Sequence, residues 1–174
     1  MPKLSDDTRK GLRARTRLVH AGRDPDQQFG FVNTPIYRGS TVLYPNMASL
    51  KTRDIPYTYG TKGTPTTRAL EEAWSEIAGA ADTVLAPSGL AAVSLALMAA
   101  VKAGDHLLVT DSAYQPTRHF CDVILKRMGV ETTYYDPLIG EGIAALFRDN
   151  TTAVLTEAPG SQSFEMQDIP AIAG

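Results

Sequence analysis

The chain has 174 residues, of which 43% are hydrophobic and 21% charged, a composition typical of a globular protein with one sizeable core. Its net charge of -2 gives no overall attraction to nucleic acid or to an anionic membrane. No apolar run reaches the ~18 residues of a membrane span, and no apolar segment follows the basic start as in a signal peptide. We therefore expect a cytoplasmic protein that binds neither nucleic acid nor membrane.

The first 63 residues differ from the rest of the chain. Their start is locally basic, which is usual for a solvated helix face. Residues 31–45 and 55–65 are expected to be extended or irregular, and the second stretch is dense in Gly, Pro, Tyr and Thr. Because neither stretch can build a core alone, we expect residues 1–63 to form an arm that lies across another surface, such as a neighbouring subunit.

From residue 64 onward, helical and strand patterns alternate. Thr64 as N-cap, Pro65 at the first helical position and Gly79 as terminator predict one helix. Further helices are predicted over 89–101, 115–129 and 142–149, and strands over 82–86, 106–110, 130–136 and 152–159. This order predicts an α/β fold in which a mostly parallel sheet lies between helices on both faces, giving three αβα layers.

The turn before the helix at 89–101 is a candidate anion site. Amides at a helix start are unpaired and the helix dipole favours an anion there. Gly89 would let a phosphate approach the main chain, and Ser88 would add a hydroxyl group. A strand-to-helix turn can also need a glycine without binding any ligand, so both interpretations stay open.

Two further loops follow predicted strands, where ligands of open α/β sheets bind. Tyr114 follows the strand at 106–110, and its ring can stack on a planar ligand or simply cover the sheet edge. Glu157 and Ser161 belong to the loop after the last predicted strand. The P-loop motif GxxxxGK[ST] and the motif GxGxxG after a strand do not occur, which disfavours nucleotide and dinucleotide binding.

Cys121 is the only cysteine, so an intrachain disulfide is excluded, and its place in a predicted helix indicates a buried, inert thiol. His20, His106 and His119 have no metal-ligand spacing with one another or with this cysteine. We therefore expect no metal site.

Taken in order, these segments resemble the pyridoxal-phosphate-dependent enzymes of cysteine and methionine metabolism, a fold type I family with cystathionine β-lyases, γ-lyases and γ-synthases. The resemblance runs over almost the whole chain, through TRLVHAGRDP, NTPIYRGSTV, YTYGTKGTPTTRALE, APSGLAAVSLAL, TDSAYQPTRHFC and EAPGSQSFEMQDIP. Within the family, YGTKGTPT, YQPTRHFCD, YYDPLIG and PGSQSFEMQDIPAI look most like the β-lyases. The resemblance implies an aspartate-aminotransferase-like large domain, of which residues 64–174 would be the first part.

The resemblance implies pyridoxal 5'-phosphate as the cofactor and assigns residues to it. The main-chain amides of Gly89 and Leu90, next to Ser88, would hold the phosphate. Tyr114 would stack on the pyridine ring, close enough to the reacting carbon to act as an acid or base. Ser161 stands where relatives often have asparagine, near the phenolic oxygen of the cofactor.

A tyrosine matching Tyr59 is donated by the neighbouring subunit to the phosphate in this family, and we count it as a candidate catalytic residue. Relatives usually have an arginine two residues later, where this chain has Thr61. Threonine donates a single hydrogen bond and brings no charge, whereas arginine offers a charged fork. Lys62 is its neighbour, but neighbours on an extended segment point to opposite faces.

The family's Schiff-base lysine, in a Ser-x-Thr-Lys setting, is missing from the chain, whose lysines are at positions 3, 10, 51, 62, 102 and 126. We therefore expect an N-terminal fragment, inactive alone, of a longer enzyme that also has a smaller C-terminal domain. The resemblance implies that this enzyme is a homotetramer, a dimer of dimers, acting in transsulfuration.

The implied reaction is α,β-elimination of L-cystathionine, an amino-acid thioether, to homocysteine, pyruvate and ammonia. One alternative is γ-elimination or γ-replacement on the same scaffold. Another is a non-catalytic α/β phosphate-binding module, if the protein ends at Gly174. A plain nucleotide-binding protein is a third alternative.

Overall fold

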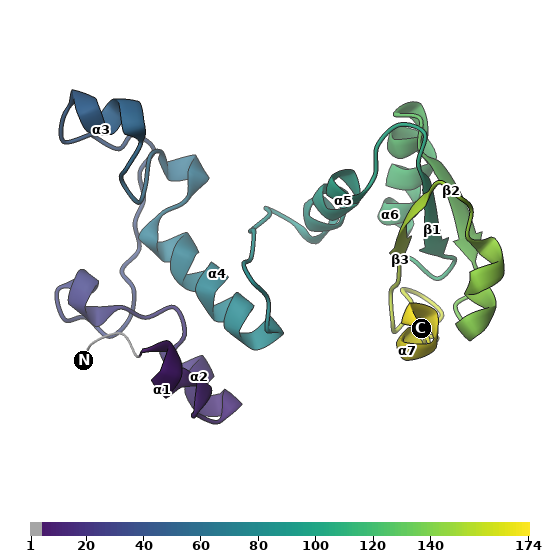
Figure 1. The fold of residues 1–174 in the computed structure, drawn as a ribbon, viewed down its shortest axis with the longest axis horizontal. Helices are drawn as coiled ribbons and strands as arrows, with labels where there is room; N and C mark the ends of the chain where they lie inside the picture. The colour runs from purple at the N-terminus through teal and green to yellow at the C-terminus, as the bar shows by residue number, and fades with distance from the viewer. Residues whose placement is uncertain (1–4) are drawn as a thin grey trace. The chain divides into compact units, whose positions relative to one another are not determined.

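The structure, a computed structural model, describes residues 5–174, which form two compact units (Figure 1). The first unit ends at Leu85, and the second runs from Ala86 to Gly174. This division lies later in the chain than the predicted boundary after residue 63, and contact of residues 1–63 with a neighbouring subunit stays a prediction. Among the described residues, no helix is long and apolar enough to cross a membrane.

The first unit consists of short helices joined by irregular segments. Its helices are α1 (Asp6–Lys10), α2 (Ala14–His20), α3 (Met47–Thr52) and α4 (Pro65–Ala78), with 3₁₀ helices η1 (Pro25–Gln28) and η2 (Gly60–Lys62). Residues 31–45 contain no helix, as predicted, and Thr41 forms an isolated antiparallel bridge with Tyr59. Among the described residues of this unit, only Ala21 and Gln28 are buried. The unit therefore has almost no core of its own.

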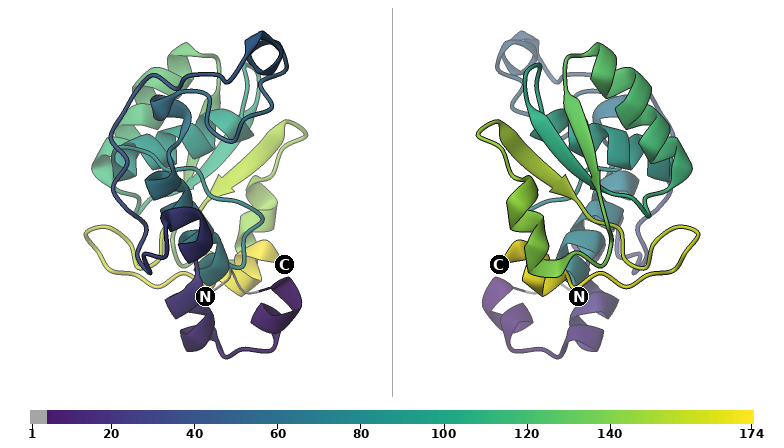
Figure 2. Two further views of the ribbon diagram at one scale, coloured as in Figure 1. Left: turned by 90° about the vertical axis from the view of Figure 1, so that its left-hand side faces the viewer. Right: turned by 90° about the vertical axis from the view of Figure 1, so that its right-hand side faces the viewer.

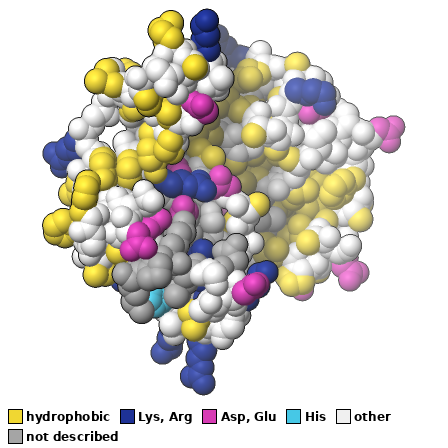
Figure 3. Space-filling view, turned by 60° about the vertical axis from the view of Figure 1, so that its left-hand side comes forward, with side chains coloured by type: hydrophobic (Ala, Val, Ile, Leu, Met, Phe, Trp, Pro, Cys, Tyr) yellow, Lys and Arg dark blue, Asp and Glu magenta, His cyan; other side chains and the backbone are white. Residues whose placement is uncertain are grey.

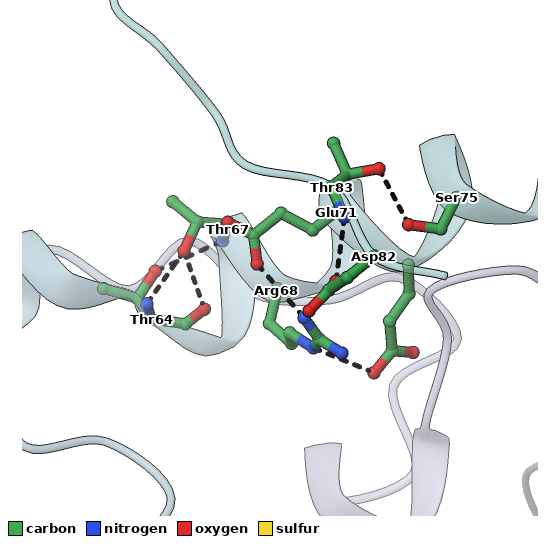
Figure 4. A network of polar contacts seen from close by, with 8 residues as sticks. Thr64, Thr67, Arg68, Glu71, Ser75, Asp82 and Thr83 are labelled. Carbon is green, nitrogen blue, oxygen red and sulfur yellow. Dashed lines mark hydrogen bonds and ion pairs between the residues drawn. The ribbon is translucent and has the colours of Figure 1, made fainter. Parts of the chain in front are cut away.

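Helix α4 begins and ends as its sequence predicts. The Thr67 amide donates to the Thr64 hydroxyl at 3.3 Å, and the Thr64 amide donates to the Thr67 hydroxyl at 2.8 Å, which makes a reciprocal capping box (Figure 4). Pro65 occupies the first turn, and Gly79 ends the helix with a φ of 64°. The sequence predicts both ends of this helix correctly because capping and termination depend only on residues that are close in the chain.

The second unit has a three-stranded parallel sheet (Figures 1 and 2). Its elements are α5 (Gly89–Ala100), β1 (His106–Thr110), α6 (Gln115–His119), the π-helical η3 (Phe120–Leu125), β2 (Glu131–Tyr135), the 3₁₀ helix η4 (Gly140–Leu146), β3 (Thr151–Leu155) and α7 (Ile169–Ala173). The strand order is β2-β1-β3, so β1 is central, and all five of its residues are buried.

Helices cover both faces of this sheet. The core on one face joins α5, β1 and η3 through buried Leu97, Leu107, Val109, Cys121 and Leu125. The core on the other face joins β1, β2 and η4 through Leu108, Tyr135 and Ile143, with Ile172 of α7 packed against it. The predicted α/β class with helices on both faces is confirmed.

The predicted strand over 82–86 is wrong. Residues 83–86 form no regular element, and the Val84 side chain is 86% exposed. A strand forms only where a neighbouring strand takes up its backbone hydrogen-bonding groups. No strand in the described part of the chain lies beside this segment.

Two other predicted elements are shorter or tighter than expected. The helix expected over 142–149 is the 3₁₀ helix η4, which starts at Gly140 and stops before Phe147. Glycine disfavours an α-helix, which fits this tighter form with Gly140 and Gly142 in it. Strand β3 ends at Leu155, four residues earlier than predicted.

Candidate active site

The loops that leave β1 and β3 meet at the carboxyl edge of the sheet. The Ser161 amide donates to the Ser112 carbonyl oxygen at 2.8 Å, and the Tyr114 amide donates to Oε2 of Glu157 at 3.1 Å. The structure therefore brings three residues that the sequence places after these strands, Tyr114, Glu157 and Ser161, onto two loops in direct contact.

Gly160 allows this contact to be close. A Cβ at this position would lie 2.6 Å from Ser112 Cβ and 2.8 Å from its Oγ, so any larger residue would force the two loops apart. A second bond holds the loop to itself, because the Gly160 amide donates to the Glu165 carbonyl at 2.9 Å. The sequence does not indicate this role of Gly160, since nothing local in a Pro-Gly pair specifies which distant residue it will contact.

A cavity of about 420 Å³ lies beside these loops and is lined by Ser112, Gln115, Pro137 and Ser161, among others. Its wall is stiffened by Arg118, whose guanidinium donates to the Asp111 carboxylate at 2.6 Å and carbonyl at 2.8 Å. The same guanidinium lies 3.9 Å from the centre of the Tyr134 ring. Because Arg118 is paired on both sides, it offers this cavity little free charge.

The pKa of Tyr134 is raised, first by burial and then by its hydrogen bond to Asp122 at 2.8 Å. The Tyr134 hydroxyl therefore stays protonated across the physiological range and serves as a structural donor. Tyr114 differs from it, because this residue is 51% exposed. Its backbone is anchored while its ring is accessible to a ligand.

Helix α5 starts at the same edge of the sheet. It is joined to β1 by the short turn 101–105 and packs on that strand through Leu97, which contacts the cluster containing Leu107 and Val109. A helix that is connected to a strand by a short turn and packs on it runs antiparallel to it. The first residue of α5, Gly89, therefore lies toward the carboxyl end of β1, on the side from which Tyr114 emerges.

The turn before α5 presents two unpaired amides. Ser88 is the N-cap, and its hydroxyl accepts from the Ala91 amide at 3.2 Å, while its carbonyl accepts from the Ala92 amide at 3.0 Å. In the described part of the chain, the amides of Gly89 and Leu90 have no acceptor. This is the usual state of a helix start that is open to an anion.

Neither strain nor packing in the described chain requires glycine at position 89. Its φ is not in the left-handed region, and a Cβ there would meet no atom within 4 Å outside its own helix and chain neighbours. A turn that needs glycine for its own conformation would show one of these two constraints. The open space beside Gly89 instead suits a ligand that approaches the main chain.

Tyr59 and Thr61 lie in the first unit, around η2. Tyr59 is 43% exposed, and the turn after it is fixed by the Gly60 amide, which donates to the Ser40 carbonyl at 2.7 Å. The segment is a 3₁₀ turn and is not extended, so the prediction that Thr61 and Lys62 point to opposite faces loses its basis. Both of these side chains are exposed.

Cys121 and His106 are excluded from this edge. Cys121 is fully buried in the core, and burial raises the pKa of its thiol to about 11, as expected for an inert cysteine. His106 is fully buried at the start of β1, the opposite end of the strand, and its ring nitrogens bond the hydroxyls of Thr151 and Thr133 at 2.7 and 2.8 Å.

Comparison with known proteins decides the family. Residues 15–174 match the sequence model of the Cys/Met metabolism PLP-dependent enzyme family. The chain belongs to this family. Pyridoxal 5'-phosphate is therefore the cofactor that its site has to fit.

Individual members of the family show the same likeness. A protein of Rhizobium johnstonii is 60% identical over 157 residues, which are 90% of this chain and 40% of that protein. Cystathionine beta-lyase MetC of Escherichia coli is 41% identical over 162 residues, 90% of this chain and 41% of the enzyme. The structure of cystathionine gamma-lyase from Lactobacillus plantarum complexed with L-serine superposes with a TM-score of 0.82 at 27% identity, covering 93% of this chain and 41% of that one. The chain thus spans about two fifths of the length of the relatives it matches.

The residues present fit the phosphate of the family's cofactor. Gly89 and Leu90 offer two unpaired amides, and a Cβ at Gly89 would meet open space, as expected for a turn against which a phosphate lies. The accessible ring of Tyr114, on an anchored backbone at the same edge, is of the right kind to cover a planar heterocycle.

Proposed function

We propose that this chain is the phosphate- and ring-binding part of a cytoplasmic carbon–sulfur lyase that splits L-cystathionine by α,β-elimination. With one water consumed, the products are homocysteine, pyruvate and ammonia. The open amide pair of Gly89 and Leu90 carries the proposal for the cofactor. The likeness to cystathionine beta-lyase MetC of Escherichia coli supports the choice of substrate.

The first role of the chain is to hold the cofactor in place. The amides of Gly89 and Leu90 donate to its phosphate, and the positive end of α5 favours that charge. The Ser88 hydroxyl, which accepts from an amide inside the helix, still has its own proton to donate outward. When bound, pyridoxal phosphate supplies an electron sink for the charge that develops at the α-carbon of the substrate.

The second role is orientation of the ring. Tyr114 covers the cofactor ring, and its hydroxyl is a candidate to donate or accept a proton near the substrate. Ser161 offers a hydroxyl group toward the phenolic oxygen. The Ser161 amide is bonded to the Ser112 carbonyl, which holds the two loops that carry these side chains beside each other.

The third role is that of the first unit, which contributes to the cofactor site of a neighbouring subunit in a dimer of dimers. Tyr59 from a neighbouring subunit reaches the phosphate, and Thr61 adds a hydrogen bond without a charge. The exposure of both side chains supports this role. The lysine that takes the α-proton comes from the part of the enzyme outside these 174 residues.

The likeness to cystathionine gamma-lyase of Lactobacillus plantarum favours a second candidate, γ-elimination. The two reactions differ in the carbon that loses sulfur, and therefore in both carbon products. β-Elimination leaves pyruvate and homocysteine, whereas γ-elimination leaves 2-oxobutyrate and cysteine.

Product analysis of the complete protein distinguishes the candidates. With pyridoxal phosphate and L-cystathionine, we expect pyruvate and homocysteine in equal amounts. 2-Oxobutyrate as the main keto acid would replace the β-lyase proposal with the γ-lyase one. Tyr114→Phe should weaken cofactor binding or slow turnover, and unchanged kinetics would assign this residue to packing alone.

A further inference from the structure

We propose that Glu157 is a positioning residue of this enzyme, whose carboxylate holds the backbone of Tyr114 and thereby the place from which its ring covers the cofactor. The proposal rests on the proposed function and adds a residue to it. Its basis is the hydrogen bond of 3.1 Å from the Tyr114 amide to Glu157 Oε2, between the loop after β1 and the loop after β3.

The main chain of Glu157 is fixed by a chain of hydrogen bonds to buried residues. Its carbonyl oxygen accepts from Nε2 of Gln167 at 2.8 Å, and Oε1 of Gln167 accepts from the Tyr135 hydroxyl at 3.0 Å. Gln167 and Tyr135 are only 6% and 2% exposed. The main chain of Glu157 is thus a rigid base from which its side chain reaches Tyr114.

The carboxylate has no competing partner in the described part of the chain. No lysine or arginine there forms an ion pair with it, and its only hydrogen bond goes to the Tyr114 amide. An ion pair elsewhere would give this glutamate a separate structural purpose. Its contacts instead point to one task, which is to hold the amide next to the Cα that carries the ring.

In the described part of the chain, two polar contacts join the loop after β1 to the loop after β3. One is Ser112, which accepts from the Ser161 amide at 2.8 Å and packs against Gly160. The other is Tyr114 through Glu157. Loss of the second point leaves the Tyr114 amide without an acceptor, while the Tyr114 carbonyl still accepts from the Thr117 and Arg118 amides at 2.9 and 3.1 Å, so Tyr114 can turn about this end of α6 with the sheet intact. A displacement of about 1 Å in a positioning group costs roughly a hundredfold in rate.

Two substitutions distinguish the effect of the length of the Glu157 side chain from the effect of its charge. Glu157→Gln keeps an acceptor oxygen at the same distance and removes the charge, whereas Glu157→Asp keeps the charge and shortens the side chain by one methylene. If Glu157 acts through its hydrogen bond to the Tyr114 amide, the kcat of Glu157→Gln stays within a few-fold of the wild-type value. Glu157→Asp then loses roughly tenfold or more. The matched control is the exposed Glu141, whose change to Gln or Asp should have no effect.

The experiment uses the complete holoenzyme and reads the visible circular dichroism of bound pyridoxal phosphate together with kcat and KM. We expect Glu157→Asp to change the cofactor signal and kcat with a smaller change in KM, and to add little in a Tyr114→Ala background. This comparison does not depend on Glu157→Ala, which could fail to fold.

Equal loss in the Gln and Asp variants, an order reversed in favour of Asp, or full additivity with Tyr114→Ala would overturn the inference. So would a cofactor signal unchanged from that of the Glu141 controls. A wild-type protein that shows no cofactor signal at all would overturn the proposed function as well. The two failures are therefore distinguishable.

Discussion

The two units of the chain differ in what stabilises them. In the second unit, Leu107, Leu108 and Val109 of the central strand are fully buried between helices on two faces. In the first unit, large apolar side chains lie on the outside, with Phe29 91% and Leu43 88% exposed. On the face drawn in Figure 3, groups of hydrophobic side chains lie at the surface of this unit. The same chain thus contains one part with its own core and one whose apolar groups are not covered by the unit itself.

Polar contacts take the place of a core in the first unit. Glu76 of α4 pairs with Arg9 at 2.7 Å and with Arg17 at 3.1 Å, which ties α1 and α2 to α4. The Thr66 hydroxyl donates to the Pro35 carbonyl and accepts from the Tyr37 amide, both at 2.8 Å. Each such contact near the surface contributes little to the free energy of unfolding. We therefore expect substitutions in the first unit to lower this free energy less than substitutions in the core of the second unit.

The largest cost is expected in the core of the second unit. Leu125→Ala removes a fully buried side chain of η3 and should lower the free energy of unfolding by about 2–5 kcal/mol. Leu138→Ala, at a side chain that is 67% exposed, should change it by less than about 0.5 kcal/mol. Urea unfolding of the complete protein measures both. Equal costs would contradict the assignment of the core.

A smaller cost is expected at the start of α4 in the first unit. Thr64→Ala removes half of the capping box and should cost about 1 kcal/mol. Thr16→Ala, at an exposed position inside α2, should cost less, since alanine favours the helix. If the two variants unfold at the same urea concentration, the cap does not contribute as proposed.

The pH dependence of stability should report on His106. Burial and then Arg148 lower its pKa in the folded protein, against a weaker opposite effect of Glu131. The unfolded chain therefore binds the proton more readily. The contribution of the neutral ring is complete above the ordinary pKa of about 6.5 and is lost as the pH falls below it.

His106→Gln should accordingly flatten the fall in unfolding free energy between about pH 7 and pH 5. The matched change His119→Gln, at an exposed histidine of α6, should leave that slope as it is in the wild type. An identical slope in all three proteins would show that His106 is not the group that titrates.

The smallest effect is expected for the ion pairs around Arg68 (Figure 4). Arg68 pairs with Asp82 at 2.9 Å and with Glu71 and Glu72 at 3.5 Å, and its side chain is 44% exposed. Solvent screens such pairs, so Arg68→Gln should matter less than Thr64→Ala, and still less at high salt. A loss as large as that of Leu125→Ala would overturn the comparison of the two units.

Local sequence signals predicted what depends on neighbouring residues. The capping box at Thr64, the end of α4 at Gly79, the start of α5 at Gly89 and the buried strand β1 are all observed where the pattern indicates them. The predictions were wrong where the structure of a segment depends on a partner far away in the sequence. The pattern of residues 82–86 suits a strand, but no strand in the described chain lies beside it.

The candidate site shows the same limit. The order of strands and loops predicted that Tyr114 and Ser161 follow neighbouring strands, since parallel strands end at one edge. The bond between Glu157 and the Tyr114 amide and the close approach of Gly160 to Ser112 were not predictable. Both depend on the register of two loops far apart in the sequence, which no local pattern specifies.

The most direct test of the account is the affinity of the complete apoprotein for pyridoxal phosphate after Gly89→Ala. Because a Cβ at Gly89 meets no atom of the described chain within 4 Å outside its own helix and chain neighbours, this variant should fold with wild-type stability. If the phosphate lies against this turn, the added methyl group weakens binding at least about tenfold, or ~1.4 kcal/mol. Gly11→Ala, where a Cβ would make only an ordinary contact of 3.6 Å with the Thr8 carbonyl oxygen, is the matched control and should bind as the wild type does. Equal affinity of the Gly89→Ala and Gly11→Ala variants would contradict the central claim.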